Sequence, residues 1–210
     1  MMLAGLLGAL LAATSAAPAA ADAPTTPGAE GEPVRVERRL LLKKGHVFAT
    51  GGLGYFSRGD YYNNPGLLAS GSWYPVEEGG LELKLALFLS SLGAAGTEVF
   101  ERTGLVPDAH RPVALLAVGG RYSVGYGKVL VDSSASKVWH FDVQAAGHVG
   151  LTFTDRGVSP SLMAGPGLLV RLSPRLHAQL DVPLVLSIEQ RSRSSIAVGL
   201  LPTLTLGVVL

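Results

Sequence analysis

The 210-residue sequence contains no cysteine, which excludes disulfides, thiolate metal ligands, a cysteine nucleophile and a lipidated cysteine anchor. Charged residues are also scarce, at 16%, whereas about 25% is usual in a soluble domain. The net charge of +1 provides no strongly basic surface for nucleic acid. Beyond the N-terminal residues, no apolar run reaches the roughly 20 residues of a membrane-spanning helix. These absences favour either a soluble all-β protein or a transmembrane β-barrel.

The residues that are abundant are apolar residues, glycine and proline. Hydrophobic residues make up 48% of the chain, and there are 27 glycines and 13 prolines. Glycine allows close strand approach and unusual backbone angles, and proline favours turns. We therefore expect many strands joined by turns rather than long helices.

Residues 1–21 are predicted to be a secretory signal peptide. Leu3 to Ala13 is an apolar segment, and Ala19-Ala20-Ala21 is a small-residue cleavage signature directly before Asp22. No lysine or arginine precedes the apolar segment, which departs from the usual signal-peptide pattern. An uncleaved membrane anchor is the alternative, although the apolar segment is short for a span.

Residues 22–45 are predicted to be a linker followed by a basic periplasmic lead-in. Residues 22–33, DAPTTPGAEGEP, have the composition of a disordered linker. Residues 34–44, VRVERRLLLKK, are rich in lysine, arginine and leucine. This second stretch is either a solvated lead-in or a short amphipathic segment at a membrane interface.

From residue 46 onward the sequence alternates between apolar and polar residues, which is typical of strands with two different faces. In Leu81 to Ser90, LELKLALFLS, five leucines share one face, whereas Glu82 and Lys84 lie on the other. Eight such strands are predicted, at His46–Phe56, Gly66–Tyr74, Leu81–Ser90, Pro112–Val124, Val138–Thr154, Val158–Leu172, Leu176–Glu189 and Ile196–Leu210. An even strand number is usual in single-chain bacterial barrels. The predicted fold class is therefore all-β: a single eight-stranded antiparallel up-and-down transmembrane β-barrel over residues 46–210.

The polar faces indicate what the interior of this barrel contains. An eight-stranded barrel is just wide enough for side chains to fill it, and buried charges require partners. The predicted inward charges are balanced: Lys84, Arg121 and Arg171 against Glu82, Asp142, Asp181 and Glu189. We therefore expect a polar, side-chain-filled lumen rather than a wide pore. Aromatic residues near strand ends are expected to form membrane girdles, namely Tyr55, Phe56, Trp73, Tyr74, Tyr122, Tyr126, Trp139 and Phe153.

If the first strand starts and the last strand finishes on the periplasmic side, the outer loops are Ser57–Pro65, Gly93–Arg111, Asp155–Gly157 and Arg191–Ser194. The longest, Gly93–Arg111, is the expected place for a surface ligand. The segment Gly125–Lys137 is long for a periplasmic turn. It either contacts a periplasmic partner or belongs to longer strands than those predicted.

Several motifs resemble an outer-membrane β-barrel domain family found mainly in myxobacteria and their relatives. They are the basic ERRLLLKKG before the first strand, Tyr126-Gly127-Lys128, and VWHFDVQAAGHVG from Val138 to Gly150. The resemblance extends from about Arg38 to the end of the chain. It implies a barrel fold and an outer-membrane location, and it implies no defined activity.

Histidine and serine are the residue types here that could carry catalytic chemistry. His140, Asp142, His148 and His177 are predicted to face the lumen, but His140 and His148 lie about 26 Å apart along one strand at roughly 3.3 Å per residue. Ser90 and Ser187 lie near predicted rims without a histidine at a readable spacing. No catalytic, cofactor-binding or metal-binding residue is therefore predicted, and no cofactor.

The function predicted from these features is an integral barrel of the bacterial outer membrane, exported through a cleaved signal peptide. Its role is structural or interactive in the cell envelope and not enzymatic. The expected partners are outer-membrane lipids and a periplasmic or envelope protein, with no nucleic acid. Two alternatives stay open: a lipid-modifying outer-membrane barrel enzyme, and a soluble periplasmic β-barrel that binds a small apolar ligand.

Overall fold

The computed structural model describes residues 42–59, 61–105, 109–132, 137–189 and 196–210. All of them belong to one compact unit, Arg39–Leu210. The predicted signal peptide, the linker, most of the basic lead-in and the predicted loop Arg191–Ser194 lie outside the described residues.

Strands dominate the described residues. In chain order the elements are β1 (Val47–Tyr55), β2 (Tyr62–Asn63), β3 (Pro65–Trp73), β4 (Gly79–Phe88), β5 (Ser91–Leu92), α1 (Ala94–Thr103), β6 (Pro112–Asp132), β7 (Lys137–Thr154), β8 (Gly157–Arg171), β9 (Leu176–Asp181), β10 (Leu184–Ile188), β11 (Ile196–Leu200) and β12 (Thr203–Val209). No described helix is long and apolar enough to cross a membrane.

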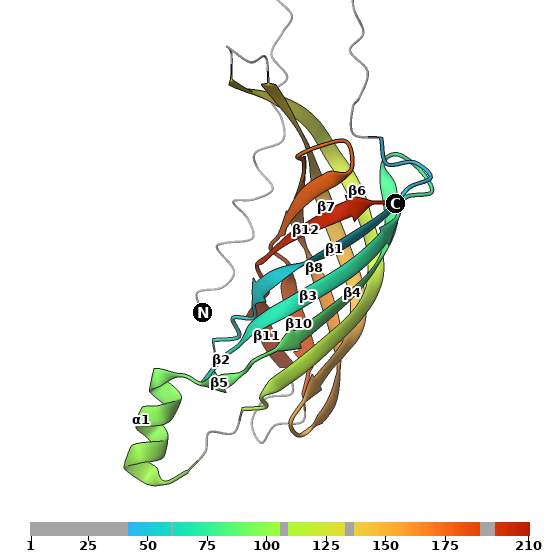
Figure 1. The fold of residues 1–210 in the computed structure, drawn as a ribbon. Helices are drawn as coiled ribbons and strands as arrows, with labels where there is room; N and C mark the ends of the chain where they lie inside the picture. Colours follow the sequence, from blue (N-terminus) through green and yellow to red (C-terminus); the bar gives the residue numbers. More distant parts are fainter. Residues whose placement is uncertain (1–41, 60, 106–108, 133–136, 190–195) are drawn as a thin grey trace, which may run out of the picture. The chain divides into compact units, whose positions relative to one another are not determined.

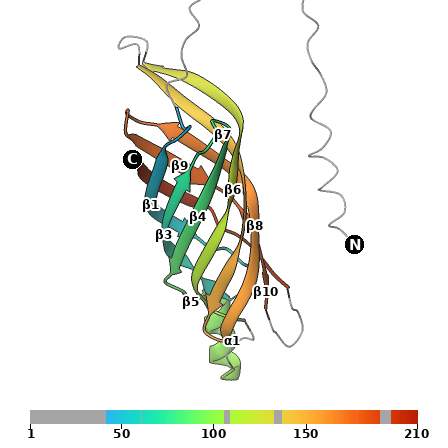
Figure 2. The ribbon, with the colours of Figure 1, turned by 90° about the vertical axis from the view of Figure 1, so that its right-hand side faces the viewer.

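The long strands form a closed antiparallel ring (Figures 1 and 2). The order around it is β1, β3, β4, β6, β7 and β8, after which β8 pairs with both β9 and β10. β10 pairs with β11 and β9 with β12, and β12 pairs with β1 to close the ring. Because β9–β10 and β11–β12 are each one interrupted strand, the ring has eight strands, which confirms the predicted fold class.

Prolines cause both interruptions. Only Val182 and Pro183 separate β9 from β10, and only Leu201 and Pro202 separate β11 from β12. Proline has no backbone N–H to donate to the ladder. The alternation of buried and exposed residues continues through both breaks, so the predicted faces of these two strands are correct.

The barrel is apolar outside and polar inside, as the alternation predicts. On β4 the odd-numbered leucines are exposed, from 41% at Leu85 to 58% at Leu81, whereas Glu82 and Lys84 are buried. The same alternation appears along β7, where Trp139 and Val149 face outward and His140 and His148 inward. This is the architecture of a transmembrane β-barrel, in which lipid meets the apolar face.

The barrel has a terminal end and a helix end. The terminal end is where β1 starts and β12 finishes, because Phe48 is paired with Val209. The helix end carries α1 and the small β2–β5 sheet, in which Tyr62 is paired with Leu92. Figure 1 shows α1 at the opposite end of the barrel from the C-terminus.

The predicted end of the fourth strand was wrong. β6 runs to Asp132 rather than Val124, and β7 begins at Lys137, so most of Gly125–Lys137 belongs to β6 and is not a loop. Gly127 resembles a turn signal in the sequence, but a Cβ there would lie 2.2 Å from the Phe141 ring. This glycine therefore allows close cross-strand packing. The two strands shift register between Ser123 and Gly125, as at a β-bulge.

The helix and the β2–β5 sheet were not predicted. α1 lies inside the expected loop Gly93–Arg111, and Gly96 is its only buried residue. A helix with so little buried surface has no strong apolar stripe in its sequence. Its C-terminal cap, Gly104, adopts a left-handed conformation with φ of 68°, which glycine permits.

Candidate functional site: the barrel interior and its terminal mouth

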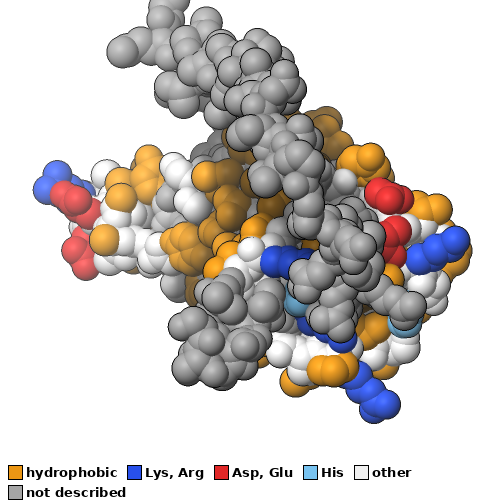
Figure 3. Space-filling view, turned by 90° about the horizontal axis from the view of Figure 1, so that it is seen from above, with side chains coloured by type: hydrophobic (Ala, Val, Ile, Leu, Met, Phe, Trp, Pro, Cys, Tyr) orange, Lys and Arg blue, Asp and Glu red, His pale blue; other side chains and the backbone are white. Residues whose placement is uncertain are grey.

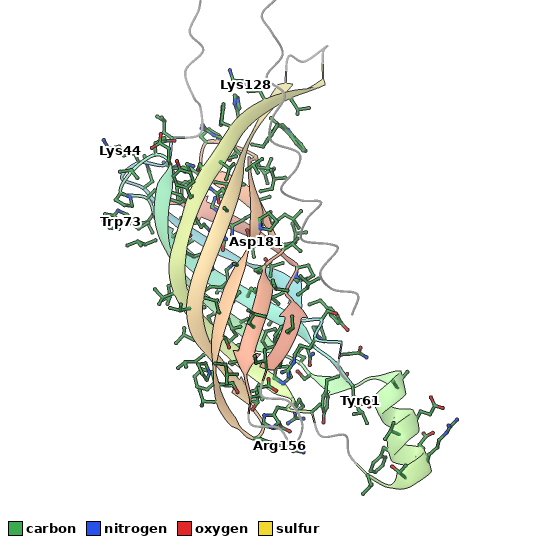
Figure 4. The ribbon with its side chains drawn as sticks, turned by 180° about the vertical axis from the view of Figure 1, so that it is seen from behind. Lys44, Tyr61, Trp73, Lys128, Arg156 and Asp181 are labelled. Carbon is green, nitrogen blue, oxygen red and sulfur yellow. The ribbon has the colours of Figure 1, made fainter. Side chains whose placement is uncertain are left out.

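A buried charged network crosses the middle of the barrel. The Arg121 guanidinium donates to Glu82 (Nε to Oε2, 2.6 Å), to Asp181 (Nη2 to Oδ2, 2.5 Å) and to the Gln144 side-chain oxygen at 3.0 Å. All four side chains are at most 3% exposed. Figure 4 shows Asp181 within the ring of strands. A buried guanidinium with this many acceptors is held in one geometry.

Two further side chains join this network. Lys84 Nζ lies 3.0 Å from Asp181 Oδ2 and 3.9 Å from Glu82 Oε2. His148 Nε2 contacts Glu82 Oε2 at 2.7 Å. The two cations Lys84 and Arg121 thus face the two carboxylates Glu82 and Asp181, in line with the balance of inward charges predicted from the sequence. The predicted pairing of inward charges is confirmed for these residues.

Toward the helix end the interior becomes apolar. Phe56, Leu68, Phe88, Leu115 and Met163 pack together and are each at most 7% exposed. The rings of Phe56 and Phe88 lie 5.4 Å apart. Phe56 was predicted to be a girdle residue, and this was wrong, because its side chain faces the interior. The alternation alone did not indicate an apolar layer inside the barrel.

A second ion pair lies beyond this layer. Arg58 and Glu189 approach to 2.7 Å, and Arg58 Nη1 donates to the His110 backbone oxygen at 3.2 Å. All three residues are buried. Glu189 was predicted as an inward charge, whereas Arg58 and His110 lie in segments predicted to be outer loops.

The terminal end is occupied by Lys43. Its Nζ lies 2.5 Å from Asp142 Oδ2 and also donates to the Ser123 hydroxyl. Its backbone N–H donates to Glu77. Lys43 was predicted to belong to a solvated or interfacial lead-in, and this was wrong, because it is only 3% exposed. No periodic pattern covers this residue, so the sequence carries no signal of its burial.

Aromatic residues also line the terminal end. Tyr74 is buried and packs edge-on against Phe48, with ring centroids 5.1 Å apart. Burial raises the pKa of Tyr74 to about 12, so it remains a neutral phenol. Tyr126 is half-buried and hydrogen-bonds to His140 Nδ1. The girdle prediction was therefore wrong for Tyr74 and Tyr126.

The remaining predicted girdle residues fit that prediction better. Tyr55, Trp73, Tyr122 and Trp139 are exposed on the outer surface, and Phe153 is half-buried. Figure 4 shows Trp73 pointing away from the barrel.

The histidines do not form one centre. His140 contacts Tyr126, His148 contacts Glu82, and the His177 ring packs edge-on against Phe48 at 5.0 Å. Among the described residues, no group of three or more histidine and carboxylate side chains is arranged to hold a metal ion.

The candidate serines are hydrogen-bonded to groups other than histidine. Ser90 Oγ donates to the Pro112 oxygen. Ser187 lies in a hydroxyl cluster, with its Oγ 3.0 Å from Ser161 Oγ and 3.4 Å from Thr152 Oγ1. Neither contact is one that activates a serine nucleophile.

Arg171 lies at the terminal mouth rather than in the central network. It was predicted to pair with an inward carboxylate, but its Nε donates to the Ser173 backbone oxygen, and no described carboxylate forms an ion pair with it. It is directly paired with His140 on β7 and with His177 on β9. Figure 3 shows Lys, Arg and His side chains at this end, with Asp and Glu side chains also visible.

No protein-family model matches the chain, and neither does any curated protein. Among solved structures, a de novo designed transmembrane β-barrel is similar, with 13% identity over 80% of this chain and 98% of that chain, at a TM-score of 0.42. The attachment invasion locus protein Ail of Yersinia pestis is similar with 12% identity over 80% of this chain and 99% of its own, at a TM-score of 0.41. The assignment of the barrel rests on the strand register described above.

Proposed function

We propose that this chain is an integral outer-membrane β-barrel, closed by its own side chains, with a structural or interaction role in the bacterial cell envelope. It acts neither as a wide pore nor as an enzyme. The proposal includes export through the signal peptide at residues 1–21. It also includes membership of the outer-membrane β-barrel domain family found mainly in myxobacteria.

The observation that carries the proposal is the inversion of polarity across the barrel wall. Leu81, Leu83, Leu85, Leu87 and Leu89 are all more than 40% exposed, whereas Arg121 and Glu82 are at most 2% exposed. Water on the outside would make this arrangement costly, because burial of apolar surface drives folding. The stretch from Leu81 to Leu89 matches the about 9–11 residues with which a tilted strand crosses the hydrocarbon core.

The interior supports a closed barrel. The Arg121 network fills the middle, and the apolar layer around Phe56 and Leu115 follows it toward the helix end. An ion entering from the terminal end meets first the Lys43–Asp142 pair and then these two layers. A hydrated ion loses its water in an apolar layer, which is strongly unfavourable.

The helix end supports an interaction role. α1 leaves Phe100 47% exposed, and Leu105 beyond it is 68% exposed. Placing the terminal end of the barrel in the periplasm puts α1 outside the cell, where a surface ligand or partner meets it. The expected periplasmic or envelope partner meets the terminal end.

Fractionation tests the membrane assignment. The full chain, expressed in a Gram-negative host, is expected in the outer-membrane fraction, and in SDS gels it migrates faster before boiling than after. The same protein in planar lipid bilayers is expected to give no steady porin-like conductance. Recovery as a soluble periplasmic monomer would contradict the membrane location. Steady conductance would contradict the closed lumen.

A further inference from the structure

A cavity of about 200 Å³ opens at the terminal end between the start of β1 and the turn from β8 to β9. One water molecule occupies roughly 30 Å³ in the liquid, so the cavity has room for a larger group. Its lining combines the polar side chains of His46, Arg171, Ser173 and His177 with apolar ones such as Leu176 and Val209. None of these residues takes part in the Arg121 network.

His177 is the anomaly in this lining. It is 1% exposed, and neither ring nitrogen has a hydrogen-bond partner among the described residues. A neutral imidazole has one donor and one acceptor, and buried polar groups are usually satisfied. Phe48 packs against one side of the ring, and a Cβ on Gly207 would lie 2.6 Å from its Nε2. The ring is thus held in place with its polar atoms unused.

Arg171 and Ser173 provide further donors at the same place. Arg171 is the direct cross-strand partner of His177, and its terminal nitrogens form no ion pair with a described carboxylate. Ser173 Oγ accepts the Leu176 N–H, which leaves the hydroxyl hydrogen available.

The surrounding charges favour an anion. Lys128 is paired in register with His140, which is in turn paired with Arg171, so basic residues occupy adjacent strands at one level. Figure 4 shows Lys128 near the far end of β6, at the terminal end of the barrel. The Asp142 carboxylate is paired with Lys43, and Glu77 accepts the N–H groups of Lys43 and Lys44.

We propose that this cavity binds a phosphate group through Arg171, His177 and Ser173. A tetrahedral oxyanion offers acceptors in several directions, which matches donors that converge from β8, β9 and the turn between them. The apolar side of the cavity accepts the carbon atoms bonded to the phosphate. The group belongs either to a phospholipid headgroup or to a soluble phosphate compound. The lipid source, but not the site itself, rests on the proposed membrane location.

The test uses the full chain folded in a maltoside detergent and a phosphate-free buffer, with histidine labelled for NMR. His177→Gln assigns the His177 ring signals among those of the five histidines. Titration with inorganic phosphate is expected to shift the His177 signals saturably. Arg171→Gln is expected to weaken the apparent affinity by roughly tenfold or more, as for a lost hydrogen bond to a charged group.

Arg175→Gln is the matched control, because Arg175 is exposed in the same turn and does not line the cavity. It is expected to leave the affinity unchanged. Equal losses of phosphate affinity in the two arginine variants would overturn the site. A response to acetate equal to the response to phosphate would overturn it as well.

A second titration with a short-chain phosphatidylglycerol distinguishes the two sources. Saturation at a lower concentration of the lipid than of inorganic phosphate identifies the headgroup, and saturation with inorganic phosphate but not with the lipid identifies a soluble compound. No saturable shift with either, in protein that still shows heat-modifiable migration, would overturn the site and leave the barrel proposal intact. Failure to fractionate with membranes would instead overturn only the proposed location.

Discussion

At the scale of single residues, Arg121 joins three other interior side chains, those of Glu82, Gln144 and Asp181. Its position on the inner face follows from the alternation along β6, and its need for acidic partners follows from its burial. Which acids it meets does not follow, because Glu82 and Asp181 lie on different strands, 39 and 60 residues away in sequence.

Replacing Arg121 with alanine is expected to lower the free energy of unfolding by about 3–5 kcal/mol, because two buried carboxylates lose their guanidinium. Urea unfolding in detergent, followed by gel mobility, measures the change. Arg175→Ala, at an exposed position, is the control and is expected to stay within about 0.5 kcal/mol of the parent. The idea fails if the two variants are equally stable, or if adding Asp181→Asn to Arg121→Ala recovers no stability.

Gly119 allows two strands to approach closely on the inner face. A Cβ there would lie 2.0 Å from the Gly147 oxygen, whereas nothing lies within 4 Å of a Cβ on Gly147. Gly119→Ala is therefore expected to destabilise the barrel by about 1–3 kcal/mol through overpacking. Gly147→Ala is the matched control and is expected to be neutral. The same urea unfolding measures both, and equal effects would show that the contact relaxes freely.

At the scale of elements, the β6–β7 hairpin extends beyond its neighbours. β4 pairs with β6 only as far as Tyr122, and β8 pairs with β7 only as far as His140. Beyond these residues each strand has a partner on one side alone, so this part of the hairpin adds little to the closed ring.

Replacing residues 129–139 with Asn-Gly is expected to leave the barrel folded. The new two-residue turn joins Lys128 to His140, which are already directly paired. Heat-modifiable migration and the thermal midpoint are expected to stay close to those of the parent. The same turn placed between Tyr122 and Ala145 also removes Ser123, Asp142 and Gln144, and we expect clear destabilisation. Loss of folding in the first variant would show that the extension is part of the barrel's stability.

At the scale of the whole molecule, the placement of polar residues is reversed relative to a soluble protein. Leu85 lies in the middle of β4, and its neighbours in register are Ala69 on β3 and Leu116 on β6. The outer surface of this region is apolar, so lipid is its natural solvent.

Leu85→Arg is expected to destabilise the protein in lipid by about 2–4 kcal/mol, the cost of a cation near the bilayer midplane. Leu105→Arg is the matched control, because Leu105 is exposed beyond α1 and outside the barrel wall, and it is expected to be neutral. Unfolding from lipid vesicles measures both. If Leu85→Arg is neutral and improves recovery without detergent, the soluble alternative is favoured instead.

The strand class, the number of long strands and the inward face of each strand can all be predicted from the order of the residues alone. They can be predicted because the pleat places successive side chains on opposite faces, so a period of two is visible locally. Glu82, Lys84, Arg121 and Asp181 were therefore predicted as interior charges. The barrel that the alternation predicts is thus confirmed in its fold.

The partners of those residues depend on how the strands are arranged in space. Lys43 lies before the first strand and Arg58 in a predicted loop, where no period assigns a face, yet both are buried. The cavity beside His177 likewise depends on the stagger of the strands, which brings the end of β8, the start of β9 and the start of β1 together at the terminal end. Contacts between strands distant in sequence are set by closure of the ring, and no local pattern encodes them.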